Sequence, residues 1–113
     1  MTDKELWEIF VPTMRPDGRP IRTRFHRVWD QEVEKISGGL TVYHPAKGRW
    51  VHKEQIFEER VIPVRIMCTE AEINKIVDFT LTYYEQIAVM AYRVSDKVIL
   101  RHRDEKGRIA RNS

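Results

Sequence analysis

Glu58 and Glu59 form a pair of adjacent carboxylates at the start of a segment in which apolar residues alternate, and such a pair could bind a cationic ligand. Successive side chains of an extended strand point to opposite faces. Glu58 would share its face with a set of apolar residues: Ile62, Val64, Ile66 and Cys68. Glu59 would share the other face with Arg65. The alternation therefore predicts that the two carboxylates serve different surfaces, and a solvated surface pair is the plainer interpretation.

Five arginines surround the start of a predicted helix and form a second candidate site: Arg15, Arg19, Arg22, Arg24 and Arg27. The first amides of a helix have no partner within the helix, so this end of a helix favours anions. A carboxylate or a phosphate could bind here. The alternative is a solvated helix face, with one arginine in a salt bridge between subunits.

The other chemically active side chains indicate no metal site and no cofactor. The four histidines do not have the spacing of metal ligands: His26, His44, His52 and His102. Cys68 falls on the predicted buried face, where a cysteine behaves as a small apolar residue. Tyr83 and Tyr84 belong to a helical stripe and are interpreted as packing residues.

The period of the apolar residues predicts an alternation of strands and helices. Four strands are expected, at 6–11, 40–44, 56–68 and 87–94, and two helices, at 21–36 and 70–84. Ser37-Gly38-Gly39 would end the first helix, and Thr69 with Glu72 has the spacing of a capping box for the second. The stretch 45–48 is expected to turn, and 98–100 to fold back as a hairpin. Pro63 indicates an edge strand or a bulge.

The order βαββαβ predicts an α+β domain of the ferredoxin-like type, in which an antiparallel sheet carries two helices on one face. The other face of the sheet is left bare. Apolar residues are expected on it: Leu6, Phe10, Val61, Met67, Val89 and Ala91. A monomer would expose this patch, whereas a second subunit would bury it. The sequence therefore predicts a homo-oligomer that associates through the bare face.

Composition predicts one folded domain over residues 1–113, with a basic, flexible tail from about residue 101. Of the 113 residues, 42% are hydrophobic and 33% are charged, which is too apolar for a disordered chain. The one cysteine excludes an intrachain disulfide. Neither a signal peptide nor a membrane span is expected, so we predict a cytoplasmic protein. The basic excess lacks interleaved aromatic residues, which makes nucleic acid an unlikely partner.

Two segments of the chain resemble the S-adenosylmethionine lyases encoded by bacteriophages, formerly described as hydrolases. The first segment is Glu58-Glu59 followed by Val64-Arg65 and Cys68, and the second is Tyr84-Glu85-Gln86 followed by Val89 and Tyr92. Vaguer likeness lies upstream, around Arg24, His26 and Arg27 and at Gly39-Leu40. Together these pieces cover half of the chain.

The resemblance implies a trimer, similar in build to nitrogen-regulatory signalling proteins of the PII type, with S-adenosylmethionine held between subunits. The implied reaction yields methylthioadenosine and homoserine lactone and needs no cofactor. The family's functional carboxylate carries over to the paired glutamates, with Glu59 preferred over Glu58 because Glu59 faces the bare side. A tyrosine that the family uses is missing here. Trp50 is expected to replace it as a substrate-binding residue, and the alternative is a structural tryptophan that anchors the hairpin. Arg65 is expected to bind substrate as well.

Two other functions fit the same fold. One is a non-enzymatic regulatory module that binds a nucleotide-like ligand between subunits. The other is an RNA-binding domain, which is disfavoured because Glu59 would repel phosphate and the sheet lacks paired exposed aromatic residues. A lyase encoded by a phage would act in the host cytoplasm and counter methyl-dependent restriction.

Overall fold

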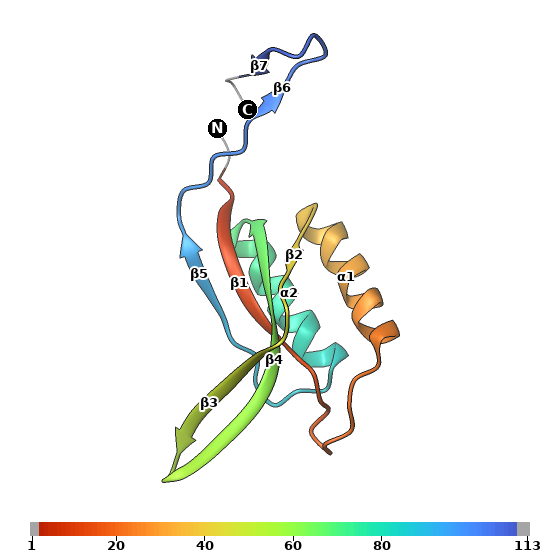
Figure 1. Cartoon of the computed structure of the whole chain (residues 1–113), viewed down its shortest axis with the longest axis vertical. Helices are drawn as coiled ribbons and strands as arrows, with labels where there is room; N and C mark the ends of the chain where they lie inside the picture. The colour runs from red at the N-terminus through yellow and green to blue at the C-terminus, as the bar shows by residue number, and fades with distance from the viewer. Residues whose placement is uncertain (1–2, 111–113) are drawn as a thin grey trace.

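The computed structural model describes residues 3–110 and shows an antiparallel sheet whose one face is covered by two helices (Figure 1). In chain order the elements are β1 (Glu5–Pro12), α1 (Thr23–Ser37), β2 (Thr41–Val42), β3 (Ala46–His52), β4 (Gln55–Cys68), α2 (Glu70–Tyr83), β5 (Ala91–Ser95), β6 (His102–Arg103) and β7 (Ile109–Ala110). The main sheet has the order β2-β4-β1-β5, and β3 pairs with β4 beyond β2. This arrangement confirms the predicted ferredoxin-like α+β fold.

The core lies between the sheet and the helices, and its strand residues follow the predicted alternation. Ile9 and Val11 from β1 meet Val64, Ile66 and Cys68 from β4, and all five are buried. The helices contribute the other side of the core: Trp29, Val33, Ile73 and Ile76. Burial of these side chains supplies the main driving force for docking the helices on the sheet.

The two helices end as their sequences predict. Gly38 follows α1 with φ of +95°, a left-handed conformation that glycine adopts without steric cost. At the start of α2 the Thr69 hydroxyl accepts a hydrogen bond from the Glu72 amide at 3.1 Å. The Glu72 carboxylate accepts one from the Thr69 amide at 2.9 Å. The capping box is therefore complete. Within residues 3–110, neither helix has the length and apolar run that crossing a membrane requires.

The expected turn at 45–48 is wrong, because Ala46 already begins β3 and Gly48 lies inside that strand opposite Glu59. The chain reverses instead at Lys53 and Glu54, whose φ angles are +50° and +65°. A two-residue loop with both φ angles positive matches the twist of a hairpin. The sequence hid this turn because neither residue is the glycine or asparagine that usually marks one.

Pro63 lies on an interior strand, so of the two expectations for it the edge strand is wrong. The register fits the other expectation, a bulge, because Val42 pairs with Val64 and Ala46 with Val61, which leaves one extra residue opposite Pro63. β4 pairs with β1 on one side and with both β2 and β3 on the other. Pro63 falls between the stretches of β4 that pair with β2 and with β3, and its carbonyl accepts a hydrogen bond from the Tyr43 amide at 2.9 Å. The neighbouring strand is thus interrupted at the point where proline has no N–H to donate.

The last strand of the main sheet, β5, is shorter than predicted, and its side chains point to the faces opposite to those we expected. Ala91 pairs with the core residue Ile9, and Tyr92 pairs with Glu8. Val89 and Ala91 therefore pack towards the helices, not on the open face where we expected them. The open face carries Met90 and Tyr92 in their place, and Val94 lies exposed at the irregularity where the register between β5 and β1 shifts. Residues 98–100 form no strand, and the basic segment after them contains the small β6–β7 hairpin.

Two parts of the chain project from the body in opposite directions: the β3–β4 hairpin and the C-terminal segment with β6 and β7 (Figure 1). The molecule measures 56 × 30 × 24 Å, and its radius of gyration is 16.5 Å. A compact domain of this length would have a radius of gyration of about 13 Å. Both projections expose large apolar side chains, among them Val51, Ile56, Ile99 and Leu100.

Candidate functional site

Glu58 and Glu59 lie on opposite faces of the β3–β4 hairpin and have different surroundings. Glu58 forms ion pairs with Arg49 Nε at 3.0 Å and with Lys47 Nζ at 3.7 Å. Glu59 lies opposite Gly48, which has no side chain to cover it. Within residues 3–110 the Glu59 side chain has no hydrogen bond and no ion pair, and it is exposed. Glu59 is therefore the carboxylate of the pair that can receive a cationic ligand.

Trp50 lies on the same face of the hairpin as Glu59. It pairs with Phe57 across the two strands, and the two rings stack with their centroids 4.6 Å apart. Glu59 is two residues further along β4, so it is a diagonal neighbour of Trp50 at a typical separation of about 7–8 Å. The hairpin thus presents an exposed carboxylate beside an exposed aromatic surface. A cation with an apolar or aromatic portion could contact both groups at once.

Arg65 lies on the Glu59 face of β4 but far from that carboxylate, six residues further along the strand, which corresponds to about 20 Å. Its Nε donates a hydrogen bond to Glu8 Oε1 at 3.1 Å, and its guanidinium stands 5.4 Å from the centroid of the Tyr43 ring. The hydrogen bond to Glu8 raises the pKa of Arg65. Within one chain, Glu59 therefore lies near Trp50, whereas Arg65 is remote from both.

Glu8 is a buried acidic residue that the sequence interpretation missed. Its side chain is only 8% exposed, although it belongs to the open face of the sheet. One carboxylate oxygen accepts from Arg65, and the other accepts from the Tyr92 hydroxyl. Arg65, Glu8 and Tyr92 thus form a row across β4, β1 and β5, and Tyr43, which directly follows β2, extends the row through its contact with Arg65. The signal in the sequence was a charged residue between Leu6 and Phe10 on an apolar face.

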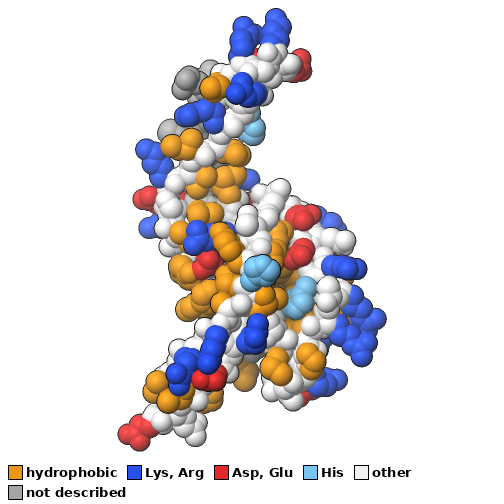
Figure 2. All heavy atoms as spheres, viewed as in Figure 1, with side chains coloured by type: hydrophobic (Ala, Val, Ile, Leu, Met, Phe, Trp, Pro, Cys, Tyr) orange, Lys and Arg blue, Asp and Glu red, His pale blue; other side chains and the backbone are white. Residues whose placement is uncertain are grey.

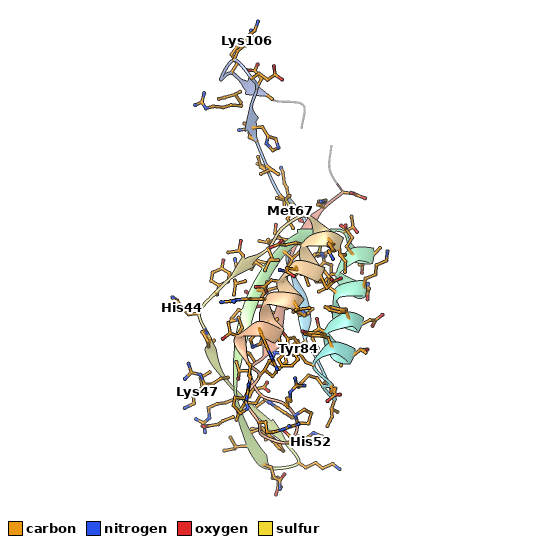
Figure 3. All side chains as sticks on the ribbon, turned by 90° about the vertical axis from the view of Figure 1, so that its right-hand side faces the viewer. His44, Lys47, His52, Met67, Tyr84 and Lys106 are labelled. Atoms are coloured by element: carbon orange, nitrogen blue, oxygen red, sulfur yellow. The ribbon has the colours of Figure 1, made fainter. Side chains whose placement is uncertain are left out.

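Tyr84, which opens the second segment of the resemblance, is part of the core. Its hydroxyl lies 2.7 Å from His26 Nδ1, and its ring is fully buried (Figure 3). Burial raises the pKa of Tyr84 and lowers the pKa of His26. Both groups are therefore neutral near pH 7, and their contact joins α1 to the end of α2. Their role in this structure is packing.

Cys68 is fully buried at the end of β4. Burial raises the pKa of its thiol to about 11. Only the thiolate is an effective nucleophile, so at neutral pH this side chain is unreactive as well as inaccessible. The structure thus places Cys68 in the core together with the other residues of its face.

No protein-family model matches the chain, and no curated protein matches its sequence. Several solved structures match the fold. CutA from Xylella fastidiosa has 14% sequence identity and a TM-score of 0.65, with 88% of each chain covered. The divalent cation tolerance protein CutA1 from Thermus thermophilus has 10% identity and a TM-score of 0.61, with 80% of this chain and 82% of that chain covered.

A phage S-adenosylmethionine lyase in complex with S-methyl-5′-thioadenosine also matches. It has 11% identity and a TM-score of 0.64, and the match covers 96% of this chain and 86% of that chain. At such low identities the likeness shows the fold alone. The chain therefore has the same ferredoxin-like α+β fold as CutA1 proteins and a phage S-adenosylmethionine lyase.

Proposed function

We propose that this protein is an S-adenosylmethionine lyase that works as a homo-oligomer with its sites between subunits. The observation that carries the proposal is the free Glu59 carboxylate beside the exposed Trp50 ring on one face of the projecting hairpin. S-adenosylmethionine offers a matching pair of groups, since it carries positive charges and an adenine ring. The shared fold with a lyase that binds S-methyl-5′-thioadenosine gives further support.

The reaction needs no external reagent. One oxygen of the substrate carboxylate attacks the γ-carbon of the methionine portion, forming a C–O bond as the C–S bond breaks. The electron pair of the C–S bond goes to sulfur, so the sulfonium becomes the neutral thioether of methylthioadenosine. The remaining fragment is homoserine lactone, which keeps the ammonium group. Holding the substrate in the bent shape that brings carboxylate and γ-carbon together could supply most of the catalysis.

In this proposal Glu59 binds the substrate ammonium and orients the methionine chain. Trp50 packs on adenine or on the sulfonium, an attraction of about 0.5–2 kcal/mol in the second case. Glu58 is the second candidate, and its ion pairs with Arg49 and Lys47 make it the less available carboxylate. Because Arg65 is remote from Glu59 in its own chain, we propose that Arg65 reaches the substrate from a neighbouring subunit.

The open face of the sheet supports the oligomer. Its exposed large side chains include Tyr43, Met90 and Tyr92, and Figure 2 shows hydrophobic side chains gathered along the sheet and the hairpin. Water contact with such a surface is unfavourable, and burial against a second copy removes it. The resemblance implies three copies, and we propose a trimer.

Turnover of S-adenosylmethionine tests the proposal directly. We expect the purified protein to release methylthioadenosine together with homoserine lactone, and chromatography measures both products. Free homoserine as the first product would mean that water, not the substrate carboxylate, attacks the γ-carbon. If methylthioadenosine forms no faster than it does by spontaneous decay of S-adenosylmethionine, the proposed enzymatic function is refuted.

The alternative is a regulatory module of PII-like architecture that binds a nucleotide-like ligand without converting it. The match to CutA1 proteins favours keeping this alternative, because the same fold occurs in proteins that are not named as lyases. Calorimetry separates the two functions. Binding of S-adenosylmethionine with no turnover would favour the regulatory module. The same result would exclude lyase activity and, with it, a role against host restriction.

A further inference from the structure

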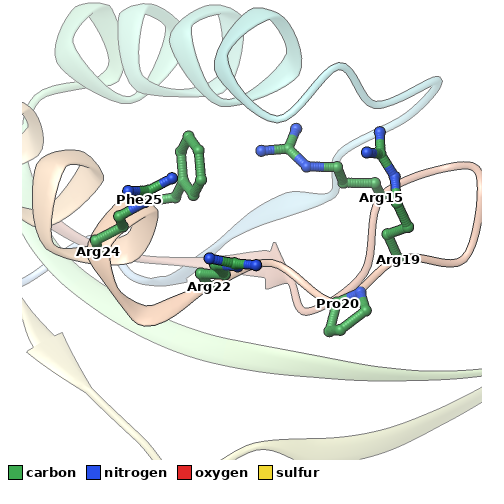
Figure 4. Close-up of a pocket in the computed structure, with 6 residues that line it drawn as sticks. All are labelled: Arg15, Arg19, Pro20, Arg22, Arg24 and Phe25. Carbon is green, nitrogen blue, oxygen red and sulfur yellow. The ribbon is translucent and has the colours of Figure 1, made fainter.

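A cavity of about 510 Å³ lies between the loop that follows β1 and the first turn of α1 (Figure 4). Its lining contains four arginines and two apolar residues: Arg15, Arg19, Pro20, Arg22, Arg24 and Phe25. The volume falls within the range of about 300–1,000 Å³ that is usual for sites of small molecules. The cavity shares no residue with the candidate site at Glu59.

The arginines on the loop are held in place by local hydrogen bonds. The Arg15 amide donates to the Arg19 carbonyl at 2.8 Å, which closes the loop. The Asp17 carboxylate accepts from the Arg19 amide at 3.0 Å and from Arg19 Nε at 2.6 Å. The position of Arg19 at the rim is thus set by the chain itself.

Phe25 holds two further guanidinium groups. The Arg15 and Arg24 guanidinium carbons lie 4.8 Å and 5.2 Å from the centroid of the Phe25 ring, as Figure 4 illustrates. The Arg15 side chain is only 17% exposed. Phe25 is itself tied to α2, because its carbonyl accepts a hydrogen bond from the Tyr83 hydroxyl at 3.0 Å. The aromatic ring therefore fixes two positive charges in one wall of the cavity.

The positive charge around the cavity is only partly balanced. Asp17 pairs with Arg19, and Glu85 lies 3.9 Å from Arg15 with a side chain that is 78% exposed. No carboxylate between residues 3 and 110 pairs with Arg22 or Arg24. The Arg15 and Arg24 guanidinium groups contact the same Phe25 ring, so their separation is comparable with the Debye length of about 8 Å at physiological salt and they repel one another. A bound anion would relieve this repulsion.

We propose that this cavity binds the phosphate group of a small soluble metabolite that carries at least two negative charges. Guanidinium forks match the geometry of phosphate oxygens, and more than one fork can engage the same group. The first turn of α1 also favours an anion, because no side chain caps it and it holds no acidic residue, although the Phe25 amide already donates a hydrogen bond to the Arg22 carbonyl at 3.0 Å. Pro20 offers an apolar surface to the organic part of the ligand.

A small ligand suits the cavity better than a nucleic acid does. Single-stranded nucleic acids bind by stacking bases on exposed aromatic rings along a basic groove. Phe25 already carries guanidinium groups from Arg15 and Arg24. The ring is therefore occupied, and what remains for a ligand is the charge of the arginines and the volume of a partly open cavity.

Titration calorimetry of the full chain at physiological ionic strength tests the proposal. The probes are inorganic pyrophosphate, ADP and a short single-stranded oligonucleotide. We expect pyrophosphate and ADP to bind. Arg22→Gln and Arg24→Gln should each weaken that binding about tenfold, because each removes a hydrogen bond between charged partners. Both residues are exposed, so folding should tolerate the changes.

Arg101→Gln is the matched control, since it removes the same charge at the opposite end of the molecule (Figure 1). We expect it to leave the affinity for pyrophosphate within about twofold of the unchanged chain, because screening weakens attraction over that distance. If Arg101→Gln and Arg24→Gln weaken pyrophosphate binding equally, the effect depends on net charge alone and the proposed site is wrong. Tighter binding of the oligonucleotide than of ADP, or no binding of either phosphate compound, would also overturn it.

Discussion

Glu58 and Glu59 show how neighbours decide what a side chain can do. The two residues are chemically identical and adjacent, yet strand alternation turns Glu58 towards Arg49 and Lys47 and Glu59 towards Gly48. An ion pair at the surface contributes little to stability, but it does occupy the carboxylate. The free carboxylate is the one that can act on a ligand.

Glu59→Gln should lower kcat/KM for S-adenosylmethionine by about 10- to 100-fold, because it replaces a hydrogen bond between charged partners with a weaker neutral one. The change is nearly isosteric and exposed, so the oligomer should persist in size-exclusion chromatography. Steady-state release of methylthioadenosine measures the effect. Glu58→Gln is the control and should retain most activity; equal losses in the two variants would show that the wrong face was chosen.

The row through Glu8 could be predicted from the sequence only in part. Alternation places Glu8 and Arg65 on the same face, and this is what the structure shows. The register that puts them directly opposite each other depends on the pairing of β1 with β4, and the two residues are 57 positions apart in the sequence. Spacing within one segment carries no information about that register.

The docking of α1 on α2 uses two polar contacts inside an apolar interface. Trp29 Nε1 donates to the Thr80 hydroxyl at 2.9 Å, and His26 meets the Tyr84 hydroxyl at 2.7 Å. Buried polar groups need such partners, since an unpaired one costs about 1–3 kcal/mol. These contacts fix how the helices sit relative to each other, in addition to the apolar packing.

The burial of His26 should make stability depend on pH. In the folded chain its pKa is lowered from 6.5, so between the two pKa values the unfolded chain binds more protons than the folded one. The free energy of unfolding should therefore be highest above pH 6.5 and decrease as the pH falls towards the folded pKa. Urea unfolding at about pH 7.5 and about pH 5.5, on either side of the unfolded pKa, measures this loss of stability.

His26→Gln should reduce this loss of stability, because glutamine does not titrate and can still pair with the Tyr84 hydroxyl. The comparison between variant and unchanged chain at the same two pH values isolates the histidine from other titrating groups. An identical loss in both proteins would show that His26 is not responsible.

At the scale of elements, the sequence predicted best where signals are local. The capping box at Thr69 and the stop at Gly38 depend on residues a few positions apart, and both are as predicted. The position of the β3–β4 turn was predicted wrongly, because Lys53 and Glu54 carry no turn signal, while Pro45 and Gly48 carry a false one. The prediction of which β5 residues face the helices was wrong for another reason. Alternation divides a strand into two sets of residues but does not say which set meets the helices.

The shape of the whole molecule departs from a compact globule because two projections and an open sheet face leave apolar side chains in water. Sequence patterns predicted the bare face. They could not predict that it contains a buried carboxylate, which depends on the pairing of the distant strands β1 and β4, or that the hairpin extends beyond the sheet, because its turn at Lys53 and Glu54 carries no sequence signal.

Met90→Lys should dissociate the proposed oligomer. The Met90 side chain is 56% exposed on the open face, and burial of a methionine contributes about 1.5–3 kcal/mol, which a charged ammonium would forfeit. Analytical ultracentrifugation should show the unchanged chain as an oligomer and the variant as a smaller species with the same far-ultraviolet circular dichroism.

Val28→Lys is the matched control, because Val28 is a partly exposed apolar residue on α1, which covers the other face of the sheet. It should sediment like the unchanged chain. If Met90→Lys sediments as an intact oligomer, the open face is not where the copies meet.

The seclusion of Cys68 gives the molecule a built-in reporter. Its side chain is fully buried in the apolar core at the end of β4, and it is the sole thiol in the chain. A maleimide or disulfide reagent can reach that atom only when β4 separates from the helices, so the rate of labelling would follow the opening of the core itself. Each variant above can thus be checked for an intact interior without introducing any foreign probe.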